Sequence, residues 1–165
     1  MKRMLGGALA LLAAPAILSG GAQAAQTLPT ELGVSLEIVE ACTVGDVVDI
    51  SFGTQGTLAA AVETQGSVEV TCPSGTAYSI ALDAGQGPVA TTTTRKMVML
   101  TDSIDYSLYR DAGRSQVWGD ESGTDTLDST GTGDAQVHTI YAKVPIQTTP
   151  PVGTYEDTVT IVVHY

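Results

Sequence analysis

Few side chains in this chain could do covalent chemistry: the two cysteines, Cys42 and Cys72, and the two histidines, His138 and His164. A catalytic site needs a nucleophile, a base and an orienting group that meet in space. Both histidines fall in alternating strand-like runs, so we expect them at the surface of strands. No hydrolase or metalloprotease motif occurs. The sequence therefore predicts no enzyme, no catalytic residue and no cofactor.

The two cysteines are predicted to form a disulfide. Lys2 and Arg3, the apolar run 5–18 and the Ala22-Gln23-Ala24 site are typical of a secretory signal peptide. A secreted chain with an even number of cysteines favours a bridge. Closing a loop of about 30 residues would stabilise the fold by roughly 3–4 kcal/mol. A metal pair is the alternative, but no further ligands stand at a suitable spacing, so no metal is expected.

Charge and hydropathy exclude two classes of partner. We expect residues 1–24 to be removed, although an uncleaved N-terminal anchor is an alternative. Seven basic residues then become five, because Lys2 and Arg3 are lost, against 18 acidic ones, a formal charge of −13. Phosphate binding needs clustered Lys and Arg, so nucleic acid and anionic membranes are disfavoured. No second long apolar run follows, so no bilayer insertion is expected.

Three further features could suggest ligands. The acidic run 120–128 is rich in oxygens but lacks the spacing of a calcium-binding EF-hand. Gly85-Gln86-Gly87 is not a phosphate loop, because no helix pattern follows. Trp118 and the scattered tyrosines could form a sugar platform, although core or inter-subunit packing is the favoured use.

The mature sequence predicts an all-β fold. Short alternating runs lie between turn residues, and no helical period is evident. Seven or so short strands, one domain and one bridge are typical of an immunoglobulin-like sandwich. We expect a long loop at 119–134 and strands at 47–52, 67–72, 78–82, 96–100, 104–109, 137–144 and 159–165.

The segment before Cys42 alternates most regularly. One face carries Leu28, Thr30, Leu32, Val34, Leu36 and Ile38, and the other is polar. Burying the last four of these side chains would contribute on the order of 6–12 kcal/mol before ordering costs. The segment is either the first strand of its own sandwich or a strand that packs against another molecule, and periodicity alone leaves both open.

A set of motifs, in order along nearly the whole mature chain, resembles the spore coat protein U domain family. Each motif alone is weak, and the ordered set is fairly specific. The motifs are Cys42-Thr43-Val44, Phe52-Gly53, Val68–Cys72, Tyr78–Gly85, Arg95-Lys96-Met97, Ile104–Asp111, Trp118-Gly119-Asp120 and Gly153–Ile161.

That resemblance implies a major subunit of an archaic, Csu-type chaperone–usher pilus. Such pilins have an incomplete immunoglobulin-like sandwich, completed by a donor strand from a neighbouring subunit. It implies residues 25–40 as donor strand and linker and 41–165 as the pilin domain. Partners would be other pilin subunits in a head-to-tail fibre, a periplasmic chaperone and an outer-membrane usher. The chaperone would pair with the C-terminal strand through Val159, Ile161, Val163 and Tyr165.

The expected function is structural: secretion through the periplasm and polymerisation into a surface pilus for adhesion and biofilm formation. One domain favours a shaft subunit over a tip adhesin. A spore or cell-surface coat protein of the same fold is the alternative. A secreted carbohydrate-binding module is an alternative of another class.

Overall fold

The computed structural model describes residues 31–39 and 41–165. The described residues fall into two units, which divide after Leu36. The predicted signal peptide and the first part of the alternating segment, including Leu28 and Thr30, lie outside the described residues. Residues 31–39 form no strand or helix within the chain.

Residues 41–165 contain eight strands and no helix. Their bounds are β1 Thr43–Val48, β2 Val62–Thr71, β3 Ala77–Leu82, β4 Arg95–Met99, β5 Asp102–Tyr109, β6 Leu127–Thr130, β7 Ala135–Val144 and β8 Ile161–His164. In this part of the chain, no helix is long and apolar enough to cross a membrane.

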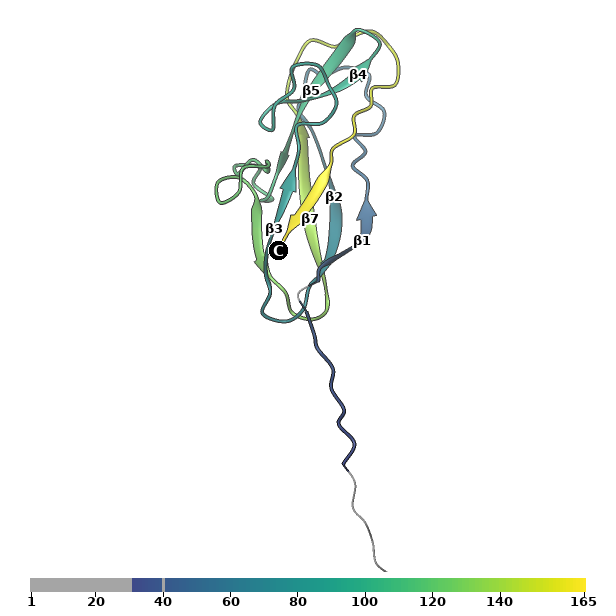
Figure 1. Cartoon of the computed structure of the whole chain (residues 1–165). Coiled ribbons are helices and arrows are strands. Elements are labelled where there is room, and N and C mark those ends of the chain that lie inside the picture. Colours follow the sequence, from purple (N-terminus) through teal and green to yellow (C-terminus); the bar gives the residue numbers. More distant parts are fainter. Residues whose placement is uncertain (1–30, 40) are drawn as a thin grey trace, which may run out of the picture. The chain divides into compact units, whose positions relative to one another are not determined.

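The strands form two antiparallel sheets (Figure 1). The larger sheet has the order β1-β2-β7-β5-β4, and the smaller has the order β6-β3-β8. The longest pairing joins β2 to β7 over ten consecutive residue pairs. β1 and β8 are therefore both edge strands, one in each sheet.

The core lies between the two sheets and follows the period-two pattern of the strands. Alternate residues of a strand face the same side, so Val68 and Val70 of β2 face Ile80 and Leu82 of β3 across the core. All four side chains are fully buried. The predicted all-β sandwich is confirmed, and the buried faces of β2, β3 and β5 are the apolar faces that alternate along these strands.

The chain leaves the larger sheet after β1, at a point where β2 carries Gly66. A Cβ atom at Gly66 would overlap the carbonyl oxygen of Val48 and lie 2.8 Å from Cγ1 of Ile50. Only a residue without a side chain permits this close approach. Residues 49–58 then run on without strand structure.

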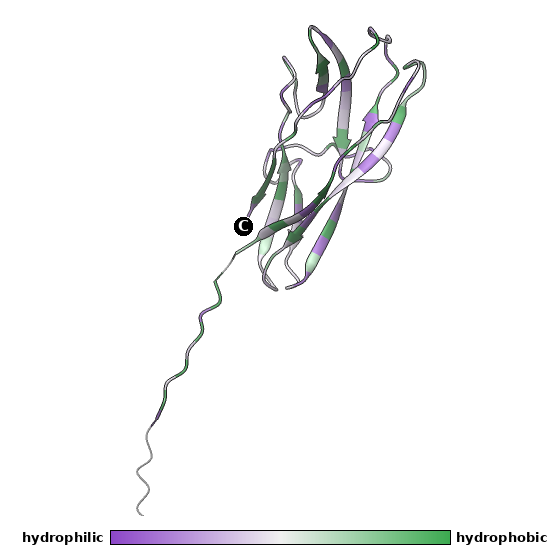
Figure 2. Ribbon diagram, turned by 90° about the vertical axis from the view of Figure 1, so that its right-hand side faces the viewer, coloured by the Kyte–Doolittle hydropathy of each residue, from purple (hydrophilic) through white to green (hydrophobic). Residues whose placement is uncertain are grey.

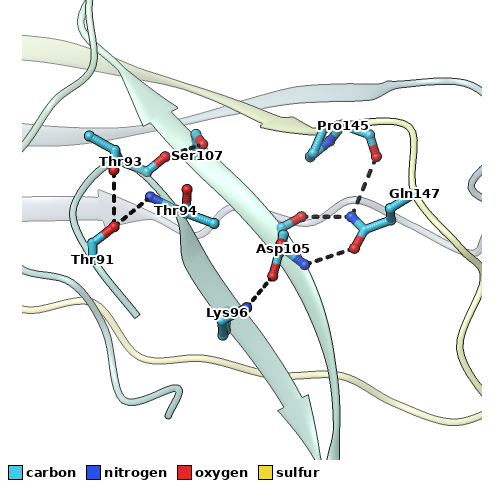
Figure 3. A network of polar contacts seen from close by, with 8 residues as sticks. All are labelled: Thr91, Thr93, Thr94, Lys96, Asp105, Ser107, Pro145 and Gln147. Atoms are coloured by element: carbon cyan, nitrogen blue, oxygen red, sulfur yellow. Dashed lines mark hydrogen bonds and ion pairs between the residues drawn. The ribbon is translucent and has the colours of Figure 1, made fainter. Parts of the chain in front are cut away.

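Side-chain hydrogen bonds hold the β4–β5 hairpin to the chain after β7 (Figure 3). The Gln147 amide donates to the carbonyl oxygen of Asp105 (2.9 Å) and accepts from the N–H of Asp105 (3.1 Å). The Asp105 carboxylate pairs in turn with Lys96 of β4. The chain just after β7 is therefore fixed against the larger sheet.

Three local predictions were wrong. The strand predicted at 47–52 is instead β1 at Thr43–Val48, because the chain leaves the larger sheet after Val48, where it passes close to Gly66 of β2. The predicted loop 119–134 contains β6, which pairs with β3. This strand has only four residues, which is too short for the alternation of side chains to be recognised in the sequence. His138 is not a surface residue: it lies on the inward face of β7, and its Nε2 is 2.7 Å from the Tyr78 hydroxyl.

Candidate functional site

The final segment of the chain, residues 149–163, has one backbone edge without a partner strand in the described structure. Glu156 exchanges backbone hydrogen bonds with Val98 of β4, and Thr160 accepts one from Asp83. Successive residues of an extended chain direct their backbone groups to alternate edges. The odd-numbered residues from Tyr155 to Val163 therefore direct theirs to the other edge, which no described strand pairs.

Beside this edge lies an elongated groove, made of two contiguous hollows of about 750 and 560 Å³. Both hollows are lined by Ile50, Met97, Tyr155 and Glu156. One wall is the chain from Val47 to Leu58. The other is the final segment, drawn in Figure 1 as the yellow coil that leads into the yellow arrow of β8. The groove lies between the edge strands β1 and β8, where a further strand could be added.

The floor of the groove is the hydrophobic core itself. The apolar side chains of the core cluster that line it are Ile50, Phe52, Leu58, Val62, Leu82, Met97, Ile104, Tyr106, Leu108, Ile140, Val144, Val159 and Ile161. Six of these side chains are buried, and the other seven, Ile50, Phe52, Val62, Met97, Ile104, Val159 and Ile161, are only partly buried. The core is therefore incompletely covered along this side of the sandwich.

The inward face of β1 shows the same deficit. Val44 pairs with Val70 and Val47 pairs with Val68, so each shares a face with a fully buried partner. Yet Val44 and Val47 are 50% and 49% exposed. These two side chains face the interior, but nothing in the described chain covers them from the opposite sheet.

Polar residues also line the groove, and one of them, Asp157, is bonded to a core side chain. Asp157 faces inward between Tyr155 and Val159, and its carboxylate accepts a hydrogen bond from the Tyr106 hydroxyl (2.7 Å). The N–H groups of Gln86 and Thr158 donate to its other oxygen. Burial and the bond to Asp157 raise the pKa of Tyr106 far above its ordinary value, so this hydroxyl keeps its proton and acts as a donor.

Behind this group lies a buried arginine. Arg95 is fully buried, and its guanidinium donates to the carbonyl oxygens of Leu82, Asp83, Thr92 and Trp118. Burial lowers its pKa, but an arginine remains charged. Burial alone would raise the pKa of Asp83, yet hydrogen bonds from Thr160 and Gly85 lower it overall. The network fixes β3, β4 and the final segment around the groove.

The segment that the alternation singled out is exposed. Leu32, Val34, Leu36 and Ile38 are 80–88% exposed, and hydropathy alternates along residues 31–39 (Figure 2). Leu28 and Thr30, the other two members of this face, lie outside the described residues. A row of exposed apolar side chains is typical of an interaction surface.

The predicted disulfide is present. Cys42 is bonded to Cys72, and no cysteine is free. Cys42 stands directly before β1 and Cys72 directly after β2. The exposed segment therefore joins the domain at a point that is covalently fixed to the second strand of the larger sheet.

The predicted chaperone-pairing residues follow the inward pattern only in part. Val159, Ile161 and Val163 are half-buried against the core, and Tyr165 is 60% exposed beyond the end of β8. The sequence analysis missed Asp157 and Tyr155. The alternation that singled out Val159 extends to both residues, so continuing the count upstream would have found them.

Other candidate sites find no support. Trp118 is fully buried and its indole N–H donates to the carbonyl oxygen of Ile80, so it cannot serve as a sugar platform. Asp125 in the acidic run accepts a hydrogen bond from the N–H of Glu121. Among residues 31–39 and 41–165, no three His, Cys, Asp or Glu side chains gather at metal-binding distance.

The groove and the fold can be compared with known proteins. The family model of the Spore Coat Protein U domain matches residues 29–162. Among solved structures, one similar chain belongs to the CsuC–CsuE chaperone–tip adhesion subunit pre-assembly complex from archaic chaperone–usher Csu pili of Acinetobacter baumannii. The two are 24% identical with a TM-score of 0.55, over 78% of this chain and 40% of the other. No curated protein gives a significant match.

Proposed function

Since the chain belongs to the Spore Coat Protein U domain family, and since its sandwich has an open groove, we propose that it is a structural pilin subunit. Each copy would insert its segment 25–38, called the tail from here on, into the groove of the next copy. Repeating this heterologous contact builds an open fibre. The observation that carries the proposal is the groove, because its floor consists of core side chains.

Size and chemistry support the match between tail and groove. The groove needs apolar side chains at every second position and backbone groups along one edge. The tail offers Leu32, Val34, Leu36 and Ile38 in that spacing, all of them exposed. Inserted there, the tail would cover the half-exposed Val44 and Val47 and would pair with the open edge of the final segment.

The partners of such a subunit follow from the same need. An unfilled groove leaves core side chains only partly covered, so a newly secreted subunit requires a protein that covers it before assembly. The similar chain from A. baumannii belongs to a complex of a chaperone and a tip adhesion subunit. We accordingly assign a periplasmic chaperone that pairs near Val159–Tyr165, an outer-membrane usher, and a role of the surface fibre in adhesion and biofilm formation.

The test is an assembly assay on the full chain, produced with its periplasmic partners. Surface material is analysed by SDS gel electrophoresis with and without boiling. We expect a ladder of multimers that collapses to monomer on boiling, because strand exchange is non-covalent but slow to reverse. Removing 25–38 should leave a chain that binds chaperone but forms no ladder.

Two results would contradict the proposal. A single monomer band before and after boiling would exclude strand exchange. A ladder from the chain without residues 25–38 would show that another surface joins the copies. The coat-protein alternative predicts normal surface deposition in cells that lack both the chaperone and the usher.

A further inference from the structure

The inward-facing side of the final segment holds one carboxylate, and the apolar face of the tail holds one hydroxyl. Asp157 is the only acid among the inward-facing residues 155, 157, 159, 161 and 163. Thr30 is the only polar residue on the face that runs from Leu28 to Ile38. A buried carboxylate and a buried hydroxyl each cost free energy unless they find hydrogen-bond partners.

We propose that the next copy's tail lies antiparallel to residues 149–163, in the one register that places Thr30 directly across from Asp157. The Thr30 hydroxyl then donates a hydrogen bond to the Asp157 carboxylate. This inference rests on the proposed function and adds to it the residue pair that selects the register.

The direction follows from where the tail joins its own domain. The tail ends at Cys42, which is bonded to Cys72 at the far end of β2. The final segment runs toward that same end, because Thr149 bonds to Leu58 before β2 and His164 pairs with Ser79 near the start of β3. A tail that came in at the disulfide end would bring two identical ends together and close a dimer. An open fibre needs the tail to come in from the Thr149 end, antiparallel to the final segment.

The register follows from the parity of the two strands and from their lengths. Inward residues are even-numbered in the tail and odd-numbered in the final segment, so permitted registers differ by steps of two residues. Placing Thr30 at Asp157 puts Ile38 at Thr149 and Leu28 at Val159. The 14 residues 25–38 then extend along residues 149–162, beside both hollows of the groove.

The two neighbouring registers pair unlike groups. A shift of two residues in one direction places Leu32 across from Asp157 and Thr30 across from Val159. The opposite shift places Leu28 across from Asp157. Each of these arrangements sets an apolar side chain against the carboxylate and leaves the Thr30 hydroxyl without this acceptor.

Asp157 has the capacity for this bond. A carboxylate has about four acceptor sites. The side-chain bonds of Asp157 come from the Gln86 N–H, the Thr158 N–H and the Tyr106 hydroxyl. The oxygen that accepts from Tyr106 has no other described donor and lies against Gly85, so the carboxylate has the capacity for one further hydrogen bond.

Cross-linking between copies tests the register. In the proposed register the outward-facing Pro29 of the tail lies across from Thr158, in a closely spaced pair suited to a disulfide. We expect the full-chain variant Pro29→Cys/Thr158→Cys to give multimers that survive boiling in SDS until a reductant is added. The matched variants Pro29→Cys/Thr160→Cys and Pro29→Cys/Glu156→Cys report the two neighbouring registers. Cross-linking in either of these, and not at Thr158, overturns the proposal.

A second test measures the dissociation rate of fibres and needs no introduced cysteines. Thr30→Val should speed the dissociation of fibres in SDS by roughly tenfold or more, because a hydrogen bond to a charged group is lost. Thr30→Ser, which keeps the hydroxyl, should stay within about threefold of the natural chain by the same reasoning. If Thr30 instead faced Val159, then Thr30→Val would leave dissociation unchanged or slow it, and that result overturns the proposal.

The outcomes separate this inference from the function beneath it. Natural fibres that dissociate on boiling, together with cross-links at the wrong pair, keep the pilin function and reject the register. A natural chain that forms no boiling-sensitive multimers rejects both. Cross-links at Thr158 with faster dissociation of Thr30→Val support both.

Discussion

At the scale of single residues, the polar groups around the groove are organised for rigidity. Arg95 donates hydrogen bonds to four carbonyl oxygens on three separate stretches of the chain. All four acceptors are backbone groups, and none is a carboxylate. Asp157 and Tyr106 add a hydrogen-bonded pair at the groove floor. Such a network holds the groove walls in place while the groove is empty, because breaking any one bond leaves a buried polar group unpaired.

His138 gives the residue-scale prediction, a loss of stability at mildly acidic pH. Burial lowers the pKa of His138 below its ordinary value of about 6.5, because removal from water disfavours the charged ring. The unfolded chain therefore takes up this proton first, and stability is full above about pH 6.5 and falls as the pH drops through the pKa of the folded state. We expect a lower urea midpoint at pH 5.5 than at pH 7.5.

His138→Gln is the matched variant, because glutamine is uncharged and can bond to the Tyr78 hydroxyl. Its urea midpoint should change less between the two pH values than that of the natural chain. The Asp83 carboxyl, whose pKa is lowered, contributes only at pH values near or below 3.8 and does not interfere. An identical pH dependence in both proteins would contradict the assignment.

At the scale of elements, the edges of two strands define the site. β1 and β8 each have one edge without a partner in the described chain. Exposed edges and apolar rows invite pairing with other chains, and natural proteins usually block them. Here the edges lie beside the groove. The disulfide fixes the start of β1 to the end of β2 and so holds this wall of the groove in position.

The two faces of the tail give the element-scale prediction. Val34→Asp places a charge on the apolar face, whereas Ser35→Asp adds the same charge one position along, on the polar face. Burying an unpaired carboxylate costs several kcal/mol, so Val34→Asp should abolish the multimer ladder. Ser35→Asp should leave it nearly intact.

Production of each variant with its chaperone controls for folding, because both substitutions lie outside the sandwich. Equal loss of multimers in both variants would show that assembly depends on the net charge of the tail and not on which face carries the charge. Equal retention would show that Val34 does not enter a groove.

At the scale of the whole molecule, the domain is strongly acidic. The described basic side chains are all engaged: Lys96, Lys143 and Arg114 pair with acids, and Arg95 and Arg110 donate to backbone carbonyls. Most of the 18 acidic side chains are therefore uncompensated. Copies brought end to end in a fibre repel one another at long range.

This charge predicts that assembly depends on salt. Raising the ionic strength from about 0.01 M to about 0.1 M shortens the screening length from roughly 30 Å to roughly 10 Å. We expect faster growth of multimers over this range, measured as the rate at which purified chaperone-bound subunits convert to the ladder. Growth that slows with added salt would indicate attraction between copies and contradict this prediction.

Much of the fold was predictable because strands reveal themselves by period. The buried faces of β2, β3 and β5 follow from alternation alone, and the bridge follows from the even count of cysteines together with the predicted signal peptide. β6 was not predictable, since four residues such as Leu127–Thr130 carry too little pattern to separate a strand from a loop. The position of β1 depends on Gly66, whose effect lies in a neighbouring strand and therefore outside any local count.

The sequence by itself predicted an all-β domain with one disulfide, preceded by an alternating apolar segment. Those properties are local: they depend on residue type, spacing and charge. The tertiary structure decided that the sandwich is open along one side, that core side chains floor the opening, and that Asp157 faces into it. An open groove is a relation between two edge strands that are more than 100 residues apart in the chain, β1 and β8. No period in a single segment can show which strand is missing between them.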